Sequence, residues 1–131
     1  MVMIKDRPLA TPQPNPETEA FIAAAQDGKL LIGRCLDTGK AFYYPRRVSP
    51  FTLSDNVEWF EASGRGTIYT FSYMPRAPEP FAIAYVELEE GPKVLTNIVD
   101  CDSDDLKIGL PVKLVFKSTE DGLPIPMFTP A

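Results

Sequence analysis

The sequence of residues 57–74, VEWFEASGRGTIYTFSYM, decides the fold that we expect for this chain. Aromatic and β-branched residues dominate both sides of a Ser63-Gly64-Arg65-Gly66 interruption, which is typical of a long strand. Two glycines inside a strand pattern indicate a bulge or a sharp bend rather than a chain end. A strand that bends in this way can serve both sheets of a small barrel, so this stretch predicts the first strand of one.

Further strand patterns follow as far as the C-terminus. Residues 81–89 and 112–118 have the alternation of half-buried strands, residues 93–100 predict a further strand between them, and residues 103–107 predict one helical turn. Residues 123–130 contain three prolines and predict at best an edge strand. Five strands with a short helix between the third and the fourth is the order of an OB-fold barrel. The pattern alone is equally compatible with another small barrel.

The N-terminal part has a different character. Residues 1–14 contain three prolines and no periodicity, so we expect an extended arm. Asn15 as N-cap and Pro16 at the first helical position predict a helix over 16–27, which Gly28 ends. Residues 29–47 predict a small hairpin. The expected class is therefore mainly β, in three parts: an arm (1–14), a helix with a hairpin (15–56) and an OB-fold domain (57–131).

The composition excludes several kinds of chemistry. The 131 residues include no histidine, which excludes Ser-His-Asp and Cys-His catalysis and histidine zinc ligands. The net charge of -5 disfavours nucleic acid as a ligand. Two cysteines make no disulfide framework, and we see no signal peptide and no apolar run that could span a membrane. We therefore expect a cytoplasmic protein.

A series of short motifs along the chain resembles a known family. In order they are Asn15–Glu19 with Phe21, Leu30-Leu31, Arg34-Cys35, Tyr44-Pro45-Arg46, Ser63–Phe71, Val99–Asp102 and Ile108–Val112. With them the chain resembles, over nearly its whole length, the acyl-CoA-associated OB-fold family known as domain of unknown function 35. Members of that family carry an N-terminal helix, a rubredoxin-like zinc ribbon and a C-terminal OB-fold.

The resemblance implies partnership rather than chemistry. Such domains assemble with thiolase-like, hydratase or aldolase enzyme subunits, and their suggested roles are docking, completing a partner's active site and helping to bind acyl-CoA. We therefore expect an accessory subunit that is not itself an enzyme, since no nucleophile with a base is visible. The alternative is an OB-fold module that binds nucleic acid, which rests on fold analogy alone.

The zinc ribbon is where this chain departs from the family. The four ligand positions correspond to Cys35, Thr38, Ser49 and Thr52, so only one of them is a thiol. Zinc prefers thiolate, imidazole or carboxylate ligands, whereas hydroxyls stay protonated at neutral pH. We expect no zinc and a structural role for Cys35. Aromatic packing is expected to hold the hairpin instead, through Phe42, Tyr43, Tyr44 and Phe51.

Basic residues gather in the middle of the chain. Residues 34–76 contain six basic and four acidic residues, whereas residues 77–131 contain four basic and ten acidic ones. We predict that four arginines near one mouth of the barrel contact the phosphates of an acyl-CoA, with ordinary solvated arginines as the alternative. The candidates are Arg46, Arg47, Arg65 and Arg76, with Trp59 or Tyr73 as the adenine stack.

The N-terminal half is also expected to be a contact surface. The arm and the hairpin have little core of their own, and without zinc they need a neighbour to pack against. We expect that neighbour to be the barrel, a partner enzyme or a second copy of the chain, which would make a homo-oligomer.

Overall fold

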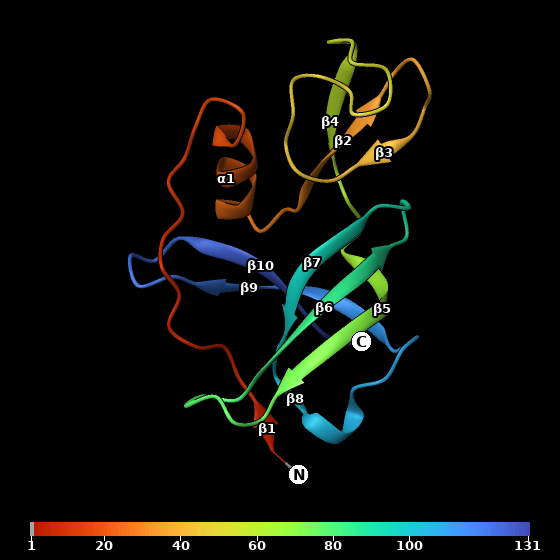
Figure 1. The fold of residues 1–131 in the computed structure, drawn as a ribbon. Helices are drawn as coiled ribbons and strands as arrows, with labels where there is room; N and C mark the ends of the chain where they lie inside the picture. The colour runs from red at the N-terminus through yellow and green to blue at the C-terminus, as the bar shows by residue number, and fades with distance from the viewer. Residues whose placement is uncertain (1) are drawn as a thin grey trace.

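The alternating segments of the C-terminal half close into a five-stranded barrel. The computed structural model describes residues 2–131, and its barrel has the strand order β10-β7-β6-β5-β9 (Figure 1). Met1, the first residue of the expected arm, lies outside the described residues. The barrel strands are β5 (Arg65–Met74), β6 (Phe81–Leu88), β7 (Lys93–Ile98), β9 (Pro111–Ser118) and β10 (Pro124–Pro130).

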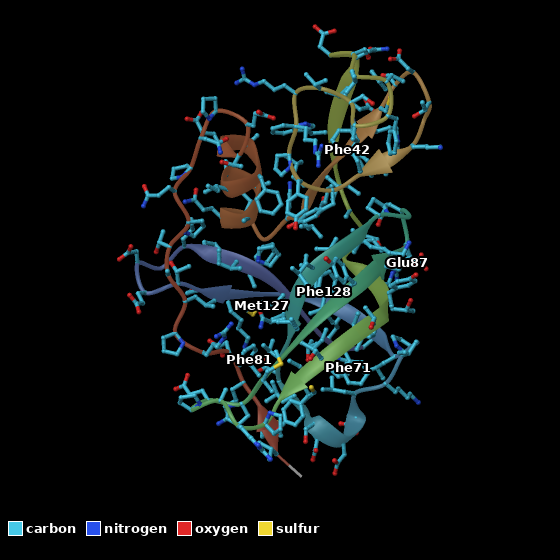
Figure 2. All side chains as sticks on the ribbon, in the orientation of Figure 1. Phe42, Phe71, Phe81, Glu87, Met127 and Phe128 are labelled. Carbon is cyan, nitrogen blue, oxygen red and sulfur yellow. The ribbon has the colours of Figure 1, made fainter. Side chains whose placement is uncertain are left out.

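The short 3-10 helix η1 (Ser103–Asp105) lies between the third and the fourth barrel strand. This is the order predicted for an OB-fold, so the predicted class, mainly β with one helix, is confirmed. Inward residues from several strands are essentially inaccessible to solvent, among them Ile68, Val86, Ile98 and Phe128. Figure 2 labels Phe128 in this interior.

Strand β10 is not the edge strand that its prolines predicted. It pairs with β9 over seven residues and with β7 at Phe128, and it thereby closes the barrel. The reason is the spacing of the prolines, which stand at positions 124, 126 and 130, on the same backbone side as Phe128. That side faces away from β9, because the Phe128 carbonyl accepts from the Val99 N–H at 2.9 Å. No proline therefore removes a hydrogen bond from the long β9 ladder.

The long first strand predicted over 57–74 is instead two strands in two sheets. Strand β4 (Val57–Glu61) pairs with β2 (Leu31–Cys35), which also pairs with β3 (Ala41–Phe42), so the predicted hairpin has a third strand. We call residues 29–61 the ribbon unit. Figure 1 shows it beyond one end of the barrel, next to helix α1. The barrel itself begins at Arg65 rather than at Val57.

The glycines that predicted a bend lie where the chain crosses between the two sheets. Gly64 has φ +82°, a conformation that favours glycine. A Cβ on Gly66 would meet the Glu87 carbonyl oxygen at 2.5 Å, so β5 and β6 approach closely there. The bulge in β5 lies further on, at Tyr69, where the pairing with β6 shifts register between Ile68 and Thr70. The expected bend is present, but the bulge is elsewhere.

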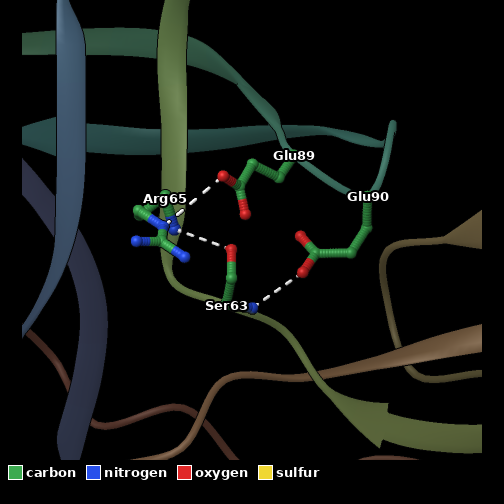
Figure 3. A network of polar contacts seen from close by, with 4 residues as sticks. All are labelled: Ser63, Arg65, Glu89 and Glu90. Atoms are coloured by element: carbon green, nitrogen blue, oxygen red, sulfur yellow. Dashed lines mark hydrogen bonds and ion pairs between the residues drawn. The ribbon is translucent and has the colours of Figure 1, made fainter.

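A polar network fixes this crossing (Figure 3). The Ser63 N–H donates to the Glu90 carboxylate at 2.7 Å, and the Arg65 N–H donates to the Ser63 hydroxyl at 3.2 Å. The Arg65 guanidinium pairs with Glu89 at 3.4 Å. Because Glu89 and Glu90 belong to the turn between β6 and β7, the network links the ribbon unit to the barrel.

Helix α1 (Glu19–Gln26) ends just before Gly28, as predicted, but it begins at Glu19 rather than at Pro16, because residues 16–18 form a turn before it. The Asn15 side chain accepts from the N–H groups of Glu17 and Thr18 at 2.9 and 3.1 Å, so it caps this turn, whereas the N-cap position of the helix is Thr18. At the other end Gly28 has φ +77°, and its N–H and that of Lys29 reach back to carbonyls of the last turn.

The arm before α1 is extended, as expected, but it is docked on the barrel. Strand β1 (Met3–Ile4) pairs with β8 (Cys101–Asp102), and Ile4 is fully buried. Further along, the Thr11 hydroxyl bonds to that of Thr119 at 2.8 Å. Part of the need for a neighbour is therefore met within the chain. No helix within residues 2–131 has the length and apolar character needed to cross a membrane.

Candidate functional site

The four positions that correspond to the family's zinc ligands converge in the ribbon unit. Cys35 ends β2, Thr38 lies in the loop that follows (residues 35–40, the first loop), and Ser49 and Thr52 lie in the loop over residues 45–56 (the second loop). Cys35 and Ser49 are fully buried. The Cys35 Sγ lies 3.9 Å from the Thr52 hydroxyl. The resemblance therefore identified a real cluster.

The two loops have the same backbone conformation. In the first, the Gly39 N–H donates to the Cys35 carbonyl at 2.7 Å; in the second, the Leu53 N–H donates to the Ser49 carbonyl at 3.0 Å. Both donors have positive φ, +74° for Gly39 and +64° for Leu53. Backbone N–H groups also point at the first side chain of each loop: those of Phe51 and Thr52 bond to the Ser49 Oγ at 3.1 and 3.2 Å.

In the first loop the equivalent acceptor is the Cys35 thiol. Burial raises the pKa of Cys35, but hydrogen bonds from Ser49, from Thr38 and from the backbone of Asp37 outweigh this and lower it to about 7. The hydrogen bonds that favour a thiolate are thus present around the sulfur of Cys35.

The side chains in this cluster do not suit zinc. A closed structural site needs four ligands of the thiolate, imidazole or carboxylate type, and the cluster offers one thiol and three hydroxyls. Within residues 2–131, no three histidine, cysteine, aspartate or glutamate side chains gather as a metal site would require. That the protein carries no zinc stays a prediction, which elemental analysis can test.

The aromatic side chains expected to support the hairpin do pack around it. Phe42, labelled in Figure 2, covers Gly33 and meets Phe51 edge-on with ring centres 6.4 Å apart. Tyr43 meets Phe21 of helix α1 in the same way at 6.1 Å, and burial raises its pKa to about 12. Tyr44 lies against Tyr43 at 4.5 Å. The cluster therefore joins the ribbon unit to the helix.

The four candidate arginines do not gather at one mouth of the barrel. Arg65 begins β5 and Arg76 follows its end, and a strand of ten residues spans about 30 Å. Arg65 is also paired with Glu89. Arg46 and Arg47 are adjacent in the second loop, where Arg47 donates to Glu17 and to the Pro16 carbonyl. Only Arg46 and Arg47 thus form a basic pair.

The two candidate stacking residues lie in different environments. Trp59 lies on β4, and its indole N–H donates to the Arg46 carbonyl at 3.3 Å, so it neighbours the basic pair. Tyr73 pairs with the buried Ala82 and packs against the barrel core, and its buried hydroxyl has no hydrogen-bond partner within residues 2–131. Tyr73 is half-buried, so its ring does not offer the open face that a stacking base needs.

The same geometry weakens the nucleic-acid alternative. A stacking platform needs a row of aromatic rings on one exposed face. Trp59 and Phe60 belong to β4 of the ribbon unit and Phe71 and Tyr73 to β5 of the barrel, so the rings lie on two different sheets. Tyr69 alone among the five aromatic residues of this segment is exposed, at 54%.

Sequence reasoning missed an open groove on the second loop, which two exposed apolar side chains and a basic pair border. Val48 and Leu53 are 44% and 80% exposed, and they line a groove of about 340 Å³. We call it the ribbon groove; its residues are Glu17, Arg46, Arg47, Val48, Ser49, Pro50 and Leu53. The only signal in the sequence was the presence of two apolar residues, Val48 and Leu53, in a loop without periodicity. Such a signal does not distinguish an exposed side chain from a buried one.

Comparison with known proteins identifies both parts of the chain. Residues 23–50 match the family described as the rubredoxin-like zinc ribbon domain of ChsH2, and residues 59–117 match the C-terminal OB-fold domain of ChsH2. A DUF35 domain-containing scaffold protein from Methanocaldococcus jannaschii is 38% identical over 101 residues, which are 70% of this chain and 72% of that protein.

Two longer relatives are named as enzyme subunits. A probable enoyl-CoA hydratase alpha subunit from Thermomonospora curvata is 30% identical over 92% of this chain, which spans 39% of that protein. The 3-oxo-4,17-pregnadiene-20-carboxyl-CoA hydratase alpha subunit from Mycobacterium tuberculosis is 37% identical over 82% of this chain and 36% of its own length.

Solved structures agree. A chain of the Ltp2-ChsH2(DUF35) aldolase superposes with a TM-score of 0.79 and 30% identity, covering 92% of this chain and 98% of that one. A DUF35 protein of unknown function from Sulfolobus solfataricus has a TM-score of 0.66 at 14% identity, over 88% of this chain and 86% of that one, which bears on the fold alone.

Proposed function

We propose that this chain, which belongs to the DUF35 family of scaffold proteins with a rubredoxin-like zinc ribbon and an OB-fold, is an accessory subunit of an acyl-CoA enzyme. Its task is to dock onto the enzyme subunit rather than to perform the chemistry. The partner belongs to the hydratase or aldolase type, and a thiolase-like subunit is the third class that the resemblance implies.

The names of the relatives support the partner type. Two of them are alpha subunits of enzymes that hydrate a CoA thioester, and the chain of known structure comes from an aldolase complex. In each case a domain similar to this chain is part of a larger assembly that acts on a substrate. The transfer of that role to this chain is the proposal.

The side chains of this chain support a role without catalysis of its own. Cys35 and Cys101 are both buried, so neither thiol is presented to a substrate. Burial, together with Asp105, Asp100 and Asp102, raises the pKa of Cys101 to about 11, which keeps it protonated at neutral pH. A nucleophile needs an open approach as well as a thiolate, and burial denies that approach to both cysteines.

The ribbon groove is the observation that carries the docking proposal. Leu53 holds a left-handed backbone conformation with its side chain 80% exposed, although the equivalent position of the first loop is a glycine. Such a conformation costs a leucine about 1–2 kcal/mol. A strained and exposed apolar side chain is typical of a surface that a partner covers. Because Arg46 and Arg47 border Leu53, the surface that fits is apolar with an acidic rim.

Capture of the partner tests this proposal. The tagged full chain is used as bait, and captured proteins are identified by mass spectrometry. We expect an acyl-CoA enzyme subunit with the wild-type chain and much less of it with Leu53→Ser. The matched control is Leu95→Ser, because Leu95 is 46% exposed on the barrel, away from the groove. Equal capture by both variants, or capture without any acyl-CoA enzyme, would contradict the proposal.

Two finer points belong to the same proposal. Arg46 and Arg47, with Trp59 beside them, are the residues we propose to contact the phosphates and the adenine of an acyl-CoA in the assembled enzyme. Self-association through the ribbon groove is the alternative to a partner subunit. Light scattering distinguishes the two, since Leu53→Ser would then convert a homo-oligomer into a monomer.

A further inference from the structure

The first loop carries a carboxylate at a position where the second loop has an aromatic ring. Asp37 stands two residues after Cys35, as Phe51 stands two residues after Ser49. Its side chain turns toward the second loop and accepts three hydrogen bonds from it. They come from the Thr52 hydroxyl at 3.0 Å, the Ser54 hydroxyl at 2.5 Å and the Asn56 amide at 2.9 Å.

The donors to Asp37 are themselves tied to the backbone of the second loop. The Thr52 hydroxyl oxygen accepts from the Ser54 N–H at 3.4 Å and lies 3.2 Å from the Ser54 hydroxyl oxygen. The Ser54 hydroxyl accepts from the Asn56 N–H at 3.3 Å. The network therefore spans the second half of that loop and ends where β4 begins.

Thr52 connects this network with the buried cluster. Its hydroxyl lies between the Asp37 carboxylate at 3.0 Å and the Cys35 Sγ at 3.9 Å. One side chain of the former ligand set thus bonds to an anion, where in the family it would bind a cation. A carboxylate has two oxygens with several acceptor sites, so the Thr52 hydroxyl, the Ser54 hydroxyl and the Asn56 amide can all donate to Asp37 at once.

We propose that the Asp37 carboxylate replaces the metal as the cross-link between the two loops, so that the ribbon unit folds without zinc while its backbone keeps the geometry of a zinc site. A zinc ion joins two loops by drawing four thiolates to one cation. Here hydroxyl and amide donors of one loop gather on a single anion of the other. This inference rests on the hydrogen bonds alone and not on the proposed function.

Hydrogen exchange of the full-length protein provides the first test. Three ribbon amides report on the cross-link, since those of Leu36, Ser49 and Leu53 donate across or within the loops. In Asp37→Ala we expect these amides to exchange at least tenfold faster, while barrel amides such as that of Val86 are unaffected. The matched control is Asp55→Ala, which removes a neighbouring exposed carboxylate. Unchanged ribbon amides in Asp37→Ala would overturn the proposal.

Restoring the ligands provides the second test, which does not depend on the stability of Asp37→Ala. The triple substitution Thr38→Cys, Ser49→Cys and Thr52→Cys completes a four-thiol set on the existing backbone. We expect one zinc per chain by elemental analysis, and tetrahedral cobalt absorption bands after exchange with Co²⁺. No metal uptake by this variant would show that the zinc geometry is lost.

The two tests combine into a third. In the zinc-loaded triple variant the metal cross-links the loops, so adding Asp37→Ala is expected to leave ribbon exchange unchanged. If Asp37→Ala accelerated exchange equally with and without zinc, Asp37 would have a local role unrelated to the cross-link. Stoichiometric zinc in the wild-type protein, lost together with ribbon protection on chelation, would also contradict the inference.

Discussion

The backbone N–H of Ser63 donates to the carboxylate of Glu90 at 2.7 Å, so the crossing from the ribbon unit to the barrel is held by the turn between β6 and β7 (Figure 3). The other Glu90 oxygen is buried and has no hydrogen-bond partner within residues 2–131. This charge-assisted hydrogen bond is therefore one of the contacts that hold the ribbon unit on the barrel, beside the packing of Leu30 and Ile32 in the shared core.

Removing this contact should destabilise the whole chain. Glu90→Ala leaves the Ser63 N–H without its acceptor, and hydrogen bonds to charged groups contribute about 1.5–3 kcal/mol. We expect the free energy of unfolding, measured with urea, to fall by about that amount. Glu79→Ala, which removes an exposed carboxylate in the turn before β6, is the control and should change it little. If the two variants were equally stable, the Glu90 carboxylate would not contribute to the stability of the junction.

A second prediction concerns the core of the ribbon unit. The Phe42 ring covers Gly33 so closely that a Cβ there would overlap it, and Phe42 is only 4% exposed. Gly33→Ala should therefore lower the free energy of unfolding by about 1–3 kcal/mol, the usual cost of overpacking. Adding Phe42→Leu should recover part of this loss, because the smaller side chain makes room. If the double variant were as unstable as the sum of the two single ones, the overlap would not be the cause.

How much of the fold could be predicted depended on whether the information was local. The strand patterns in residues 81–89 and 112–118 and the helix end at Gly28 are local signals, and the structure has all of them. Which partner a strand finds is not local. The segment 57–61 has a strand pattern that fits either sheet, and its pairing with β2 depends on the loops that bring the two together. The prolines of β10 were misjudged because a proline disrupts a sheet only if its nitrogen faces a paired strand. Which side of β10 is paired over its length is known only once its partner is known.

The candidate site divides in the same way. The ligand positions Cys35, Thr38, Ser49 and Thr52 could be placed together by resemblance, and they do converge. Arg65 and Arg76 were wrongly grouped, because a count of charges along a segment does not show that two of its residues lie at opposite ends of one strand. Asp37 escaped notice because its importance comes from donors that lie 15 to 19 residues away in the sequence.

A third prediction concerns alkaline pH. Burial and three aspartates raise the pKa of Cys101 from near 9 to about 11 in the folded chain. A group whose pKa is raised on folding contributes stability that is fully present below the unfolded pKa and lost as the pH rises toward the folded one. Between pH 9 and 10 the unfolded chain should therefore release this proton while the folded chain keeps it.

We expect the free energy of unfolding to fall by roughly 1 kcal/mol over this range, since one pKa unit corresponds to about 1.4 kcal/mol. Cys101→Ala should be flatter with pH over the same interval. Tyr43 has its pKa raised to about 12 and contributes only above pH 10, so the range chosen separates the two groups. Identical pH profiles of the wild type and Cys101→Ala would exclude the thiol as the cause.

The last prediction concerns the basic pair in the ribbon groove. If Arg46 and Arg47 contact the phosphates of an acyl-CoA in the assembled enzyme, replacing both by alanine removes two charge-assisted hydrogen bonds. At roughly 1.5–3 kcal/mol each, their loss should weaken acyl-CoA binding by the assembled complex at least tenfold. The control is Arg76→Ala, because Arg76 follows the far end of β5. Isothermal titration of acyl-CoA into each complex, at equal subunit occupancy, gives the affinities. If the double variant and the Arg76 variant bound acyl-CoA equally well, Arg46 and Arg47 would have no role in phosphate binding. They would then be docking contacts for the acidic rim of the partner, and the double variant would assemble with the partner subunit less completely.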